Sequence, residues 1–98
     1  MSLRHLVLLR FHEGTEPAQV EAIAEALRTL PGQIPELQGY RVGPDLGLAD
    51  GNFAFGISAD FASQADYETY RDHPAHQAVI HELIAPHVAA RAAVQYAT

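Results

Sequence analysis

The first strand pattern of the chain carries apolar residues on both of its faces. From Leu3 to Phe11 the residues alternate between two series, Leu3, His5, Val7, Leu9 and Phe11 in one and Arg4, Leu6, Leu8 and Arg10 in the other. A strand in a half-exposed sheet carries polar residues on its free face, but Leu6 and Leu8 occupy that series here. This pattern predicts that helices cover one face and that a second layer or a second copy of the chain covers the other.

The remaining helix and strand patterns predict a split β-α-β arrangement. Apolar residues at helical spacing follow Thr15 and Pro17 up to Pro31, and further helices are expected from a cap at Ser63 and from Pro74 to just before Pro86. Strand patterns cover residues 38–42, 53–61 and 88–96, of which the last is rich in alanine and is also compatible with a helix. The order β-α-β-β-α-α-β predicts an α+β protein, in which a four-stranded antiparallel sheet carries its helices on one face.

The size and charge of the chain limit its domain number and its partners. Its 98 residues are enough for one domain, residues 1–98, and a domain of this size gains buried surface by associating with a second copy. The net charge of −6, without a basic cluster, disfavours nucleic acid as a partner. The absence of cysteine excludes disulfides and thiol chemistry. No apolar run is long enough for a membrane span and no signal peptide is recognised, so we expect no membrane association and a cytoplasmic location.

The segment from Tyr70 to His76 is the strongest candidate for chemistry. It places a phenol and two imidazoles within seven residues, around Pro74, which ends one helix and begins the next. His76 then lies in the first turn of the new helix, where the helix dipole and free N–H groups favour a neutral imidazole. A phenol beside a neutral imidazole is suited to taking a proton from a carbon acid and stabilising the enolate. Two ordinary histidines near a helix break remain the alternative interpretation.

Metal and cofactor sites are not indicated by the sequence. His73 and His76 are separated by the Pro74 break, and no third ligand for a transition metal is evident. Gly43, Gly47 and Gly51 do not match a phosphate-binding loop, because no helix follows them. We therefore expect neither a metal nor a cofactor.

Several motifs together resemble the stress-responsive dimeric α/β-barrel (Dabb) family. The matching segments are Arg4–Phe11, Leu30-Pro31, Ile34-Pro35, Gly43, Phe61 and Tyr70-x-x-His73-Pro74-x-His76. They extend over nearly the whole chain, and the most specific of them is the His-Pro-x-His motif. The resemblance implies a ferredoxin-like protomer that pairs with a second copy into a dimeric barrel. It also implies a cavity between the sheet and the helices.

The resemblance also suggests site residues, by analogy with the olivetolic acid cyclase-like polyketide cyclases of that family. These enzymes catalyse aldol ring closure without a cofactor, and their tyrosine–histidine pair and first-strand histidine match Tyr70, His76 and His5. Two further cavity positions, a histidine and a tyrosine in the cyclase, correspond here to Phe55 and Leu27, which implies a more apolar cavity. The expected lining residues are Leu27, Phe55, Tyr67, His73 and Ile80.

Two functions are compatible with these residues. In the first, His76 moves a proton, Tyr70 stabilises an oxyanion and His5 orients one of them, in an enzyme of the aldol cyclase or lyase type acting on a small hydrophobic or aromatic ligand. In the second, the chain is a non-catalytic dimeric stress or ligand-binding protein. The two differ in whether Tyr70 and His76 converge on an open cavity or bury their polar atoms against each other and the backbone.

Overall fold

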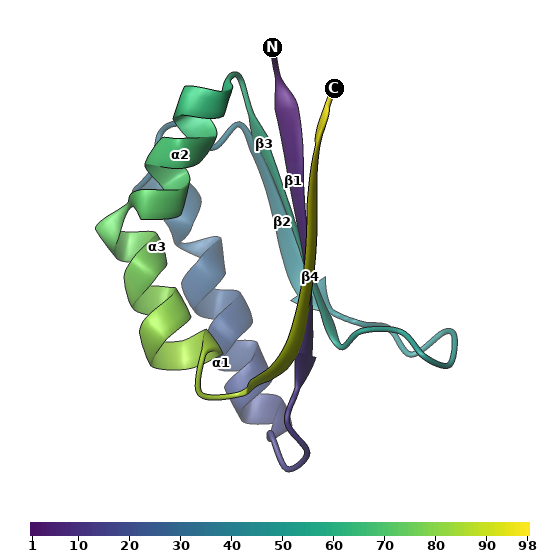
Figure 1. Cartoon of the computed structure of the whole chain (residues 1–98). Helices are drawn as coiled ribbons and strands as arrows, with labels where there is room; N and C mark the ends of the chain where they lie inside the picture. The colour runs from purple at the N-terminus through teal and green to yellow at the C-terminus, as the bar shows by residue number, and fades with distance from the viewer.

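The protein consists of a four-stranded antiparallel sheet with its helices packed on one face (Figure 1). The computed structural model describes residues 1–98. The strands lie in the order β2-β3-β1-β4 and every neighbouring pair is antiparallel, which confirms the predicted α+β, ferredoxin-like protomer. The elements are β1 (Leu3–Phe11), α1 (Pro17–Arg28), a 3-10 turn (Leu30–Gly32), β2 (Gly39–Pro44), β3 (Phe55–Phe61), α2 (Gln64–Asp72), α3 (Pro74–Val79), a π-helical turn (Ile80–Ile84) and β4 (Val88–Ala97).

The second and third strands differ from their predicted bounds. The second strand continues through Gly43 and Pro44, which pair with Gly56 and Phe55, whereas the sequence predicted a connection there. Pro44 is compatible with a strand because β2 lies at the edge of the sheet, where a missing N–H does not interrupt a ladder on both sides. The third strand begins at Phe55 instead of residue 53. Phe53 is not paired with a neighbouring strand, and the Arg10 guanidinium lies 4.4 Å from the centroid of its ring.

The helix breaks before and after α2 follow the local sequence. The Ser63 hydroxyl accepts a hydrogen bond from the Asp66 N–H, which confirms the predicted cap. His73 adopts an extended conformation ahead of Pro74, so α2 ends at Asp72 and α3 begins at Pro74 as expected. The first helix begins with Glu16 and not Thr15 at its cap; the Glu16 N–H donates to Oε1 of Gln19.

The helix that starts at Pro74 does not stay α-helical up to Pro86. It widens into a π-turn in which the Ala85 N–H donates to the carbonyl of Ile80, five residues earlier. The wider turn changes which residue faces inward: Ile84 is buried, whereas Leu83, which continues the helical spacing of His76 and Ile80, is only half-buried. The change brings Ile84 toward the sheet beside Ile80.

The hydrophobic core lies between the inner face of the sheet and α1, α2 and α3. The predicted series on β1 that contains His5 and Val7 points into it, and so do the alternate residues of β3. The core residues are Val7, Leu9, Ile23, Ala24, Leu27, Leu30, Ile34, Phe55, Ile57, Ala59, Phe61, Tyr70 and Ile84.

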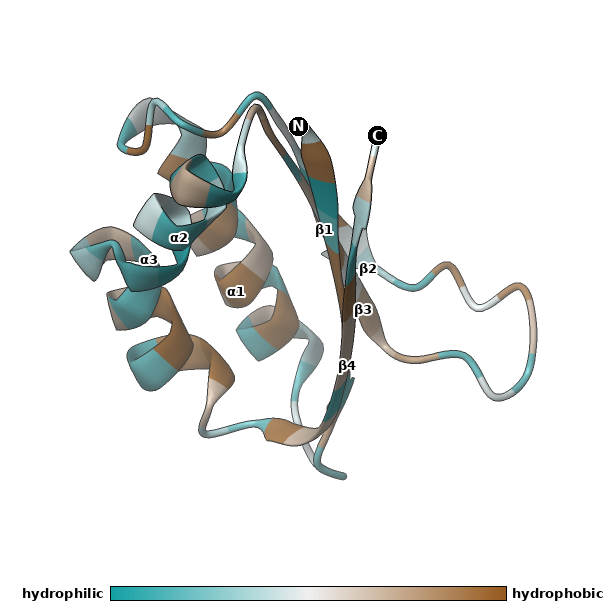
Figure 2. Ribbon diagram, turned by 45° about the horizontal axis from the view of Figure 1, so that its top comes forward, coloured by the Kyte–Doolittle hydropathy of each residue, from teal (hydrophilic) through white to brown (hydrophobic).

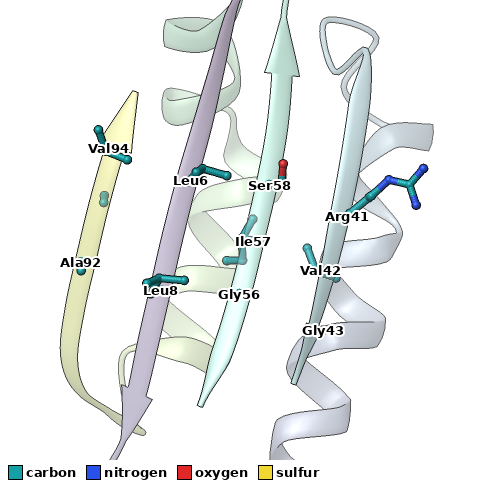
Figure 3. Close-up of a pocket in the computed structure, with 11 residues that line it drawn as sticks. Leu6, Leu8, Arg41, Val42, Gly43, Gly56, Ile57, Ser58, Ala92 and Val94 are labelled. Carbon is teal, nitrogen blue, oxygen red and sulfur yellow. The ribbon is translucent and has the colours of Figure 1, made fainter. Parts of the chain in front are cut away.

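The opposite face of the sheet has no covering layer within one chain. Leu6 and Leu8 of β1 point to this outer face, together with Ala92 and Val94 of β4 and Arg41 of β2 (Figure 3). The face is hollowed by a depression of about 470 Å³, and its middle is apolar along β1 and β4. The loop between β2 and β3 projects to the same side, away from the helices (Figures 1 and 2). The helices of the protein are all too short or too polar to span a lipid bilayer.

Candidate active site

A cavity of about 360 Å³ lies between the sheet and the α2 to α3 segment. This volume falls within the usual range of small-molecule sites, about 300 to 1,000 Å³. Its apolar wall consists of Val7, Leu9, Leu27, Ile57, Ile80, Ile84, Ala85 and Val88, and its polar residues are His5, Tyr67, Tyr70, Arg71, His76, Gln77 and Arg91. The predicted residues Tyr70, His76 and His5 are therefore brought to one cavity, as are Leu27, Tyr67 and Ile80.

The side chains of Tyr70 and His76 are stacked against each other. Their ring centroids lie 4.1 Å apart and the ring planes differ by 30°. The extended conformation of His73 produces this contact, because it turns the chain between the end of α2 and the start of α3. The two rings touch through their faces, and no hydrogen bond joins the phenol to the imidazole.

The backbone fixes the protonation state of His76. Nδ1 lies 3.1 Å from the carbonyl oxygen of Arg71, and since a carbonyl only accepts, Nδ1 carries the proton in the neutral ring. Nε2 is then left with its lone pair and has no protein partner. Burial lowers the pKa of His76, while hydrogen bonds to backbone carbonyls oppose the shift. His76 is accordingly a neutral imidazole with a free basic nitrogen.

The hydroxyl of Tyr70 is held by a second tyrosine that the sequence did not identify. Tyr70 is only 2 % exposed, and its oxygen lies 3.2 Å from the hydroxyl oxygen of Tyr40 on β2. Burial raises the pKa of Tyr70 to about 12 and raises that of Tyr40 as well, so both phenols keep their protons near neutral pH. When Tyr40 donates to Tyr70, the Tyr70 hydroxyl hydrogen is free for another acceptor.

His5 reaches the cavity from the sheet. Its Nδ1 lies 2.6 Å from Nε2 of Gln95, an amide nitrogen that only donates, so the proton of the neutral ring is on Nε2. The His5 ring also packs against Tyr67, with centroids 5.0 Å apart. Burial lowers the pKa of His5 to about 4, and the nearby positive charge of Arg91 adds to the shift. His5 therefore acts as a neutral N–H donor in the fold.

Arg91 is a cavity residue that sequence reasoning missed. It lies on β4 opposite Leu9, and this register puts its side chain on the inner face with Gln95. The alternation of residues 91, 93 and 95 along β4 was visible in the sequence, but only the pairing with β1 shows that this series faces inward. Arg71 also borders the cavity, but its guanidinium donates twice to the carboxylate of Asp72, at 2.9 and 3.0 Å.

Two residues expected in the cavity do not line it. His73 instead caps α3, where its Nδ1 accepts a hydrogen bond from the Ala75 N–H at 3.0 Å. Phe55 is buried in the core and packs edge-on against Phe11, with centroids 6.2 Å apart. Both residues have local packing roles that keep their side chains away from the cavity.

The cavity combines one basic nitrogen with several donors. Nε2 of His76 can accept a proton, whereas Nε2–H of His5, the Tyr70 hydroxyl and the Arg91 guanidinium can donate to an oxygen. The surrounding wall is apolar, which strengthens such contacts by excluding water. The arrangement is chemically suited to proton transfer at a carbon acid whose oxygen becomes negative.

Comparisons with known proteins extend over the whole chain. Residues 3–98 match the family model described as the stress responsive A/B barrel domain, Dabb. An uncharacterized protein of Streptomyces coelicolor is 32 % identical over 78 residues, which make up 78 % of this chain and 80 % of that protein.

Two solved structures show how closely the fold is shared. A dimeric ferredoxin-like protein of unknown function from Thermobifida fusca is 45 % identical, with a TM-score of 0.93 over all of this chain and 92 % of the other. A hydroxynitrile lyase from Passiflora edulis is 22 % identical, with a TM-score of 0.83 over 97 % of this chain and 91 % of the other, a likeness of fold alone. Since the family model matches almost every residue, this chain belongs to the stress responsive A/B barrel domain (Dabb) family.

Proposed function

We propose that this protein is a cofactor-free enzyme of the cyclase or lyase type that acts on a small apolar carbonyl compound. The single observation that carries the proposal is the hydrogen bond from Nδ1 of His76 to the Arg71 carbonyl. It leaves Nε2 unprotonated in a ring that borders an apolar cavity beside a protonated tyrosine. A base and an oxyanion donor in one apolar site are the two groups that enolisation requires.

The proposed reaction begins with proton transfer. Nε2 of His76 takes a proton from the carbon next to the carbonyl, and the electron pair of the broken C–H bond forms the enolate. The Tyr70 hydroxyl and Nε2–H of His5 donate to the enolate oxygen as its charge develops. The enolate carbon then attacks an electrophilic carbonyl carbon, whose π electrons move to its oxygen, and that oxygen takes the proton back from His76. Without an electrophile, the enolate carbon itself recovers the proton from His76. No oxidant, reductant or metal is needed to balance these steps.

The fold is compatible with lyase chemistry. The Passiflora edulis protein is named as a hydroxynitrile lyase and has the same arrangement of sheet and helices. Cleavage of a hydroxynitrile also begins with proton transfer to a base: the hydroxyl loses its proton, its oxygen forms a carbonyl, and the carbon–carbon bond to cyanide breaks. The shared fold supports the class of chemistry and does not indicate a substrate.

We also propose that the enzyme is a homodimer joined through the outer face of the sheet. Leu8 and Val94 are large, exposed and adjacent to Leu6 on that face, which is the pattern of a surface that a partner covers. Leu46 and Leu48 are 81 % and 84 % exposed in the loop that projects to the same side. The Thermobifida fusca relative is described as dimeric.

A non-catalytic ligand-binding protein is the second candidate. The contact between the hydroxyls of Tyr70 and Tyr40 favours it, because that hydrogen bond also satisfies two buried groups in a purely structural cavity. In this case ligand binding would not depend on the free nitrogen of His76.

Exchange of carbon-bound hydrogen separates the two candidates. The dimer would be incubated with 2-heptanone in deuterated buffer, and loss of the α-proton signals would be followed by NMR. The enzyme accelerates exchange over buffer, and His76→Gln abolishes the acceleration while the protein stays folded. Arg28→Gln, which changes an exposed residue of α1, is the matched control and leaves the rate unchanged. Equal rates with the native protein and with His76→Gln would eliminate the enzymatic proposal.

A further inference from the structure

The polar lining of the cavity has a charge opposite to that of the whole protein. The chain has a net charge of −6 and 12 acidic residues, but none of these acidic side chains lines the cavity. Two arginines do, Arg71 and Arg91. A neutral ligand requires no such segregation, whereas an anion is attracted to a site from which carboxylates are excluded.

The charge of Arg91 is left without a partner. The three salt bridges of the chain use Arg4, Arg28 and Arg71, and Arg91 has neither an ion pair nor a side-chain hydrogen bond. Arg71 is already neutralised by Asp72 through two hydrogen bonds. Of the two guanidinium groups at the cavity, the one on Arg91 is therefore free to bind a ligand.

Arg91 lines the same cavity as the three candidate catalytic groups, His5, Tyr70 and His76. Its positive charge contributes to the lowered pKa of His5. The helical side of the cavity includes the apolar residues Leu27 and Ile80, whereas Arg91 belongs to the sheet. A ligand that fits has one anionic end near Arg91 and an apolar body against that wall.

We propose that the cavity binds an apolar acid and that Arg91 holds its carboxylate. The inference rests on the proposed function in using the same cavity, and it names the class of substrate: a carbonyl compound with a carboxylate group and an apolar chain. A planar guanidinium binds a carboxylate through two parallel hydrogen bonds, which fixes the orientation of the ligand as well as its charge. The carbonyl group would then be presented to His76 at a set distance from the carboxylate.

The test compares octanoate with octanamide, which has the same chain and no charge. Isothermal titration of the native protein gives a Kd for octanoate about tenfold lower than for octanamide. Arg91→Gln removes this preference and leaves octanamide binding unchanged, Arg91→Lys keeps part of it, and Arg28→Gln keeps all of it. Octanoate also shifts the NMR signals of the His5 and His76 rings and not those of the Leu6 and Leu8 methyl groups.

The inference would be overturned if the native protein bound octanoate and octanamide with equal affinity, or if Arg91→Gln weakened the binding of both probes equally. Shifts confined to the Leu6 and Leu8 methyl groups would do the same, because they would place the probe on the outer face. The proposed function fails separately: octanoate preference without exchange of 2-heptanone protons eliminates catalysis and leaves the carboxylate site. Exchange without any octanoate preference eliminates the carboxylate site and leaves catalysis.

Discussion

The imidazole of His76 stacks on the phenol ring of Tyr70 at a centroid distance of 4.1 Å. The hydroxyl of Tyr70 meanwhile binds Tyr40, and Nδ1 of His76 binds the Arg71 carbonyl. The sequence left open whether the two side chains converge on a cavity or bury their polar atoms against protein groups. Both descriptions apply, since the two rings share a cavity and some of their polar atoms hydrogen-bond to other protein groups. What remains available to a ligand is Nε2 of His76 and one hydrogen of the tyrosine pair.

Tyr70 and His76 are expected to act as one unit in catalysis. Tyr70→Phe and His76→Ala each reduce 2-heptanone exchange by about a hundredfold, and the double variant loses little more, because each group is ineffective without the other. Tyr70→Phe also leaves the Tyr40 hydroxyl without its partner and costs about 1 kcal/mol of unfolding free energy. Exchange rates and melting temperatures of the three variants check the prediction. Multiplied losses in the double variant, or lower stability with an unchanged rate, would argue for independent or structural roles.

His76 is expected to titrate below the ordinary histidine value of 6.5. Burial is the main cause of the lowered pKa, since it disfavours the charged ring. A carboxylate would raise the pKa instead, but the nearby Asp72 is engaged by Arg71. NMR titration of the ring carbons measures the value. A midpoint above 6.5 would remove the argument for a general base.

The protein is expected to lose stability in mild acid partly through His5. The pKa of His5 is about 4 in the fold and about 6.5 in the unfolded chain, so the unfolded chain binds a proton more tightly between these values. The contribution of neutral His5 to the free energy of unfolding is complete above pH 6.5 and is lost as the pH falls from there toward 4. Between pH 7 and pH 4.5, the free energy of unfolding of the native protein falls by about 2 to 3 kcal/mol more than that of His5→Gln. Urea unfolding at fixed protein concentration measures it, and parallel pH profiles of the two proteins would contradict it.

Replacement of Leu6 and Leu8 by aspartate is expected to separate the dimer. The two charges would be desolvated in the proposed interface, which is unfavourable by several kcal/mol, so the variant is a monomer or an aggregate. Ala18→Asp with Ala22→Asp adds the same charge to the exposed face of α1 and keeps the dimer. Analytical ultracentrifugation at micromolar concentration distinguishes these states. A native protein that sediments as a monomer would refute the proposed assembly.

The sequence by itself determined the order of the elements and most of their bounds. Alternation on β1 assigned His5 to one face and Leu6 and Leu8 to the other, and Pro74 determined where α2 gives way to α3. These features are local, because side-chain period and proline geometry act within a few residues. The same local rules brought Tyr70 and His76 to one place.

Only the tertiary structure decided the polar partners of the cavity. Arg91 and Gln95 reach it because β4 pairs with β1 in one particular register, and a shift by one residue would have turned both outward. Tyr40 meets Tyr70 across 30 residues of sequence, through the packing of α2 on the sheet. The π-turn moved Ile84 inward in place of Leu83, since a change in hydrogen-bond pattern alters the helical period. Register, long-range packing and helix widening depend on contacts between distant segments, and a local pattern carries no information about them.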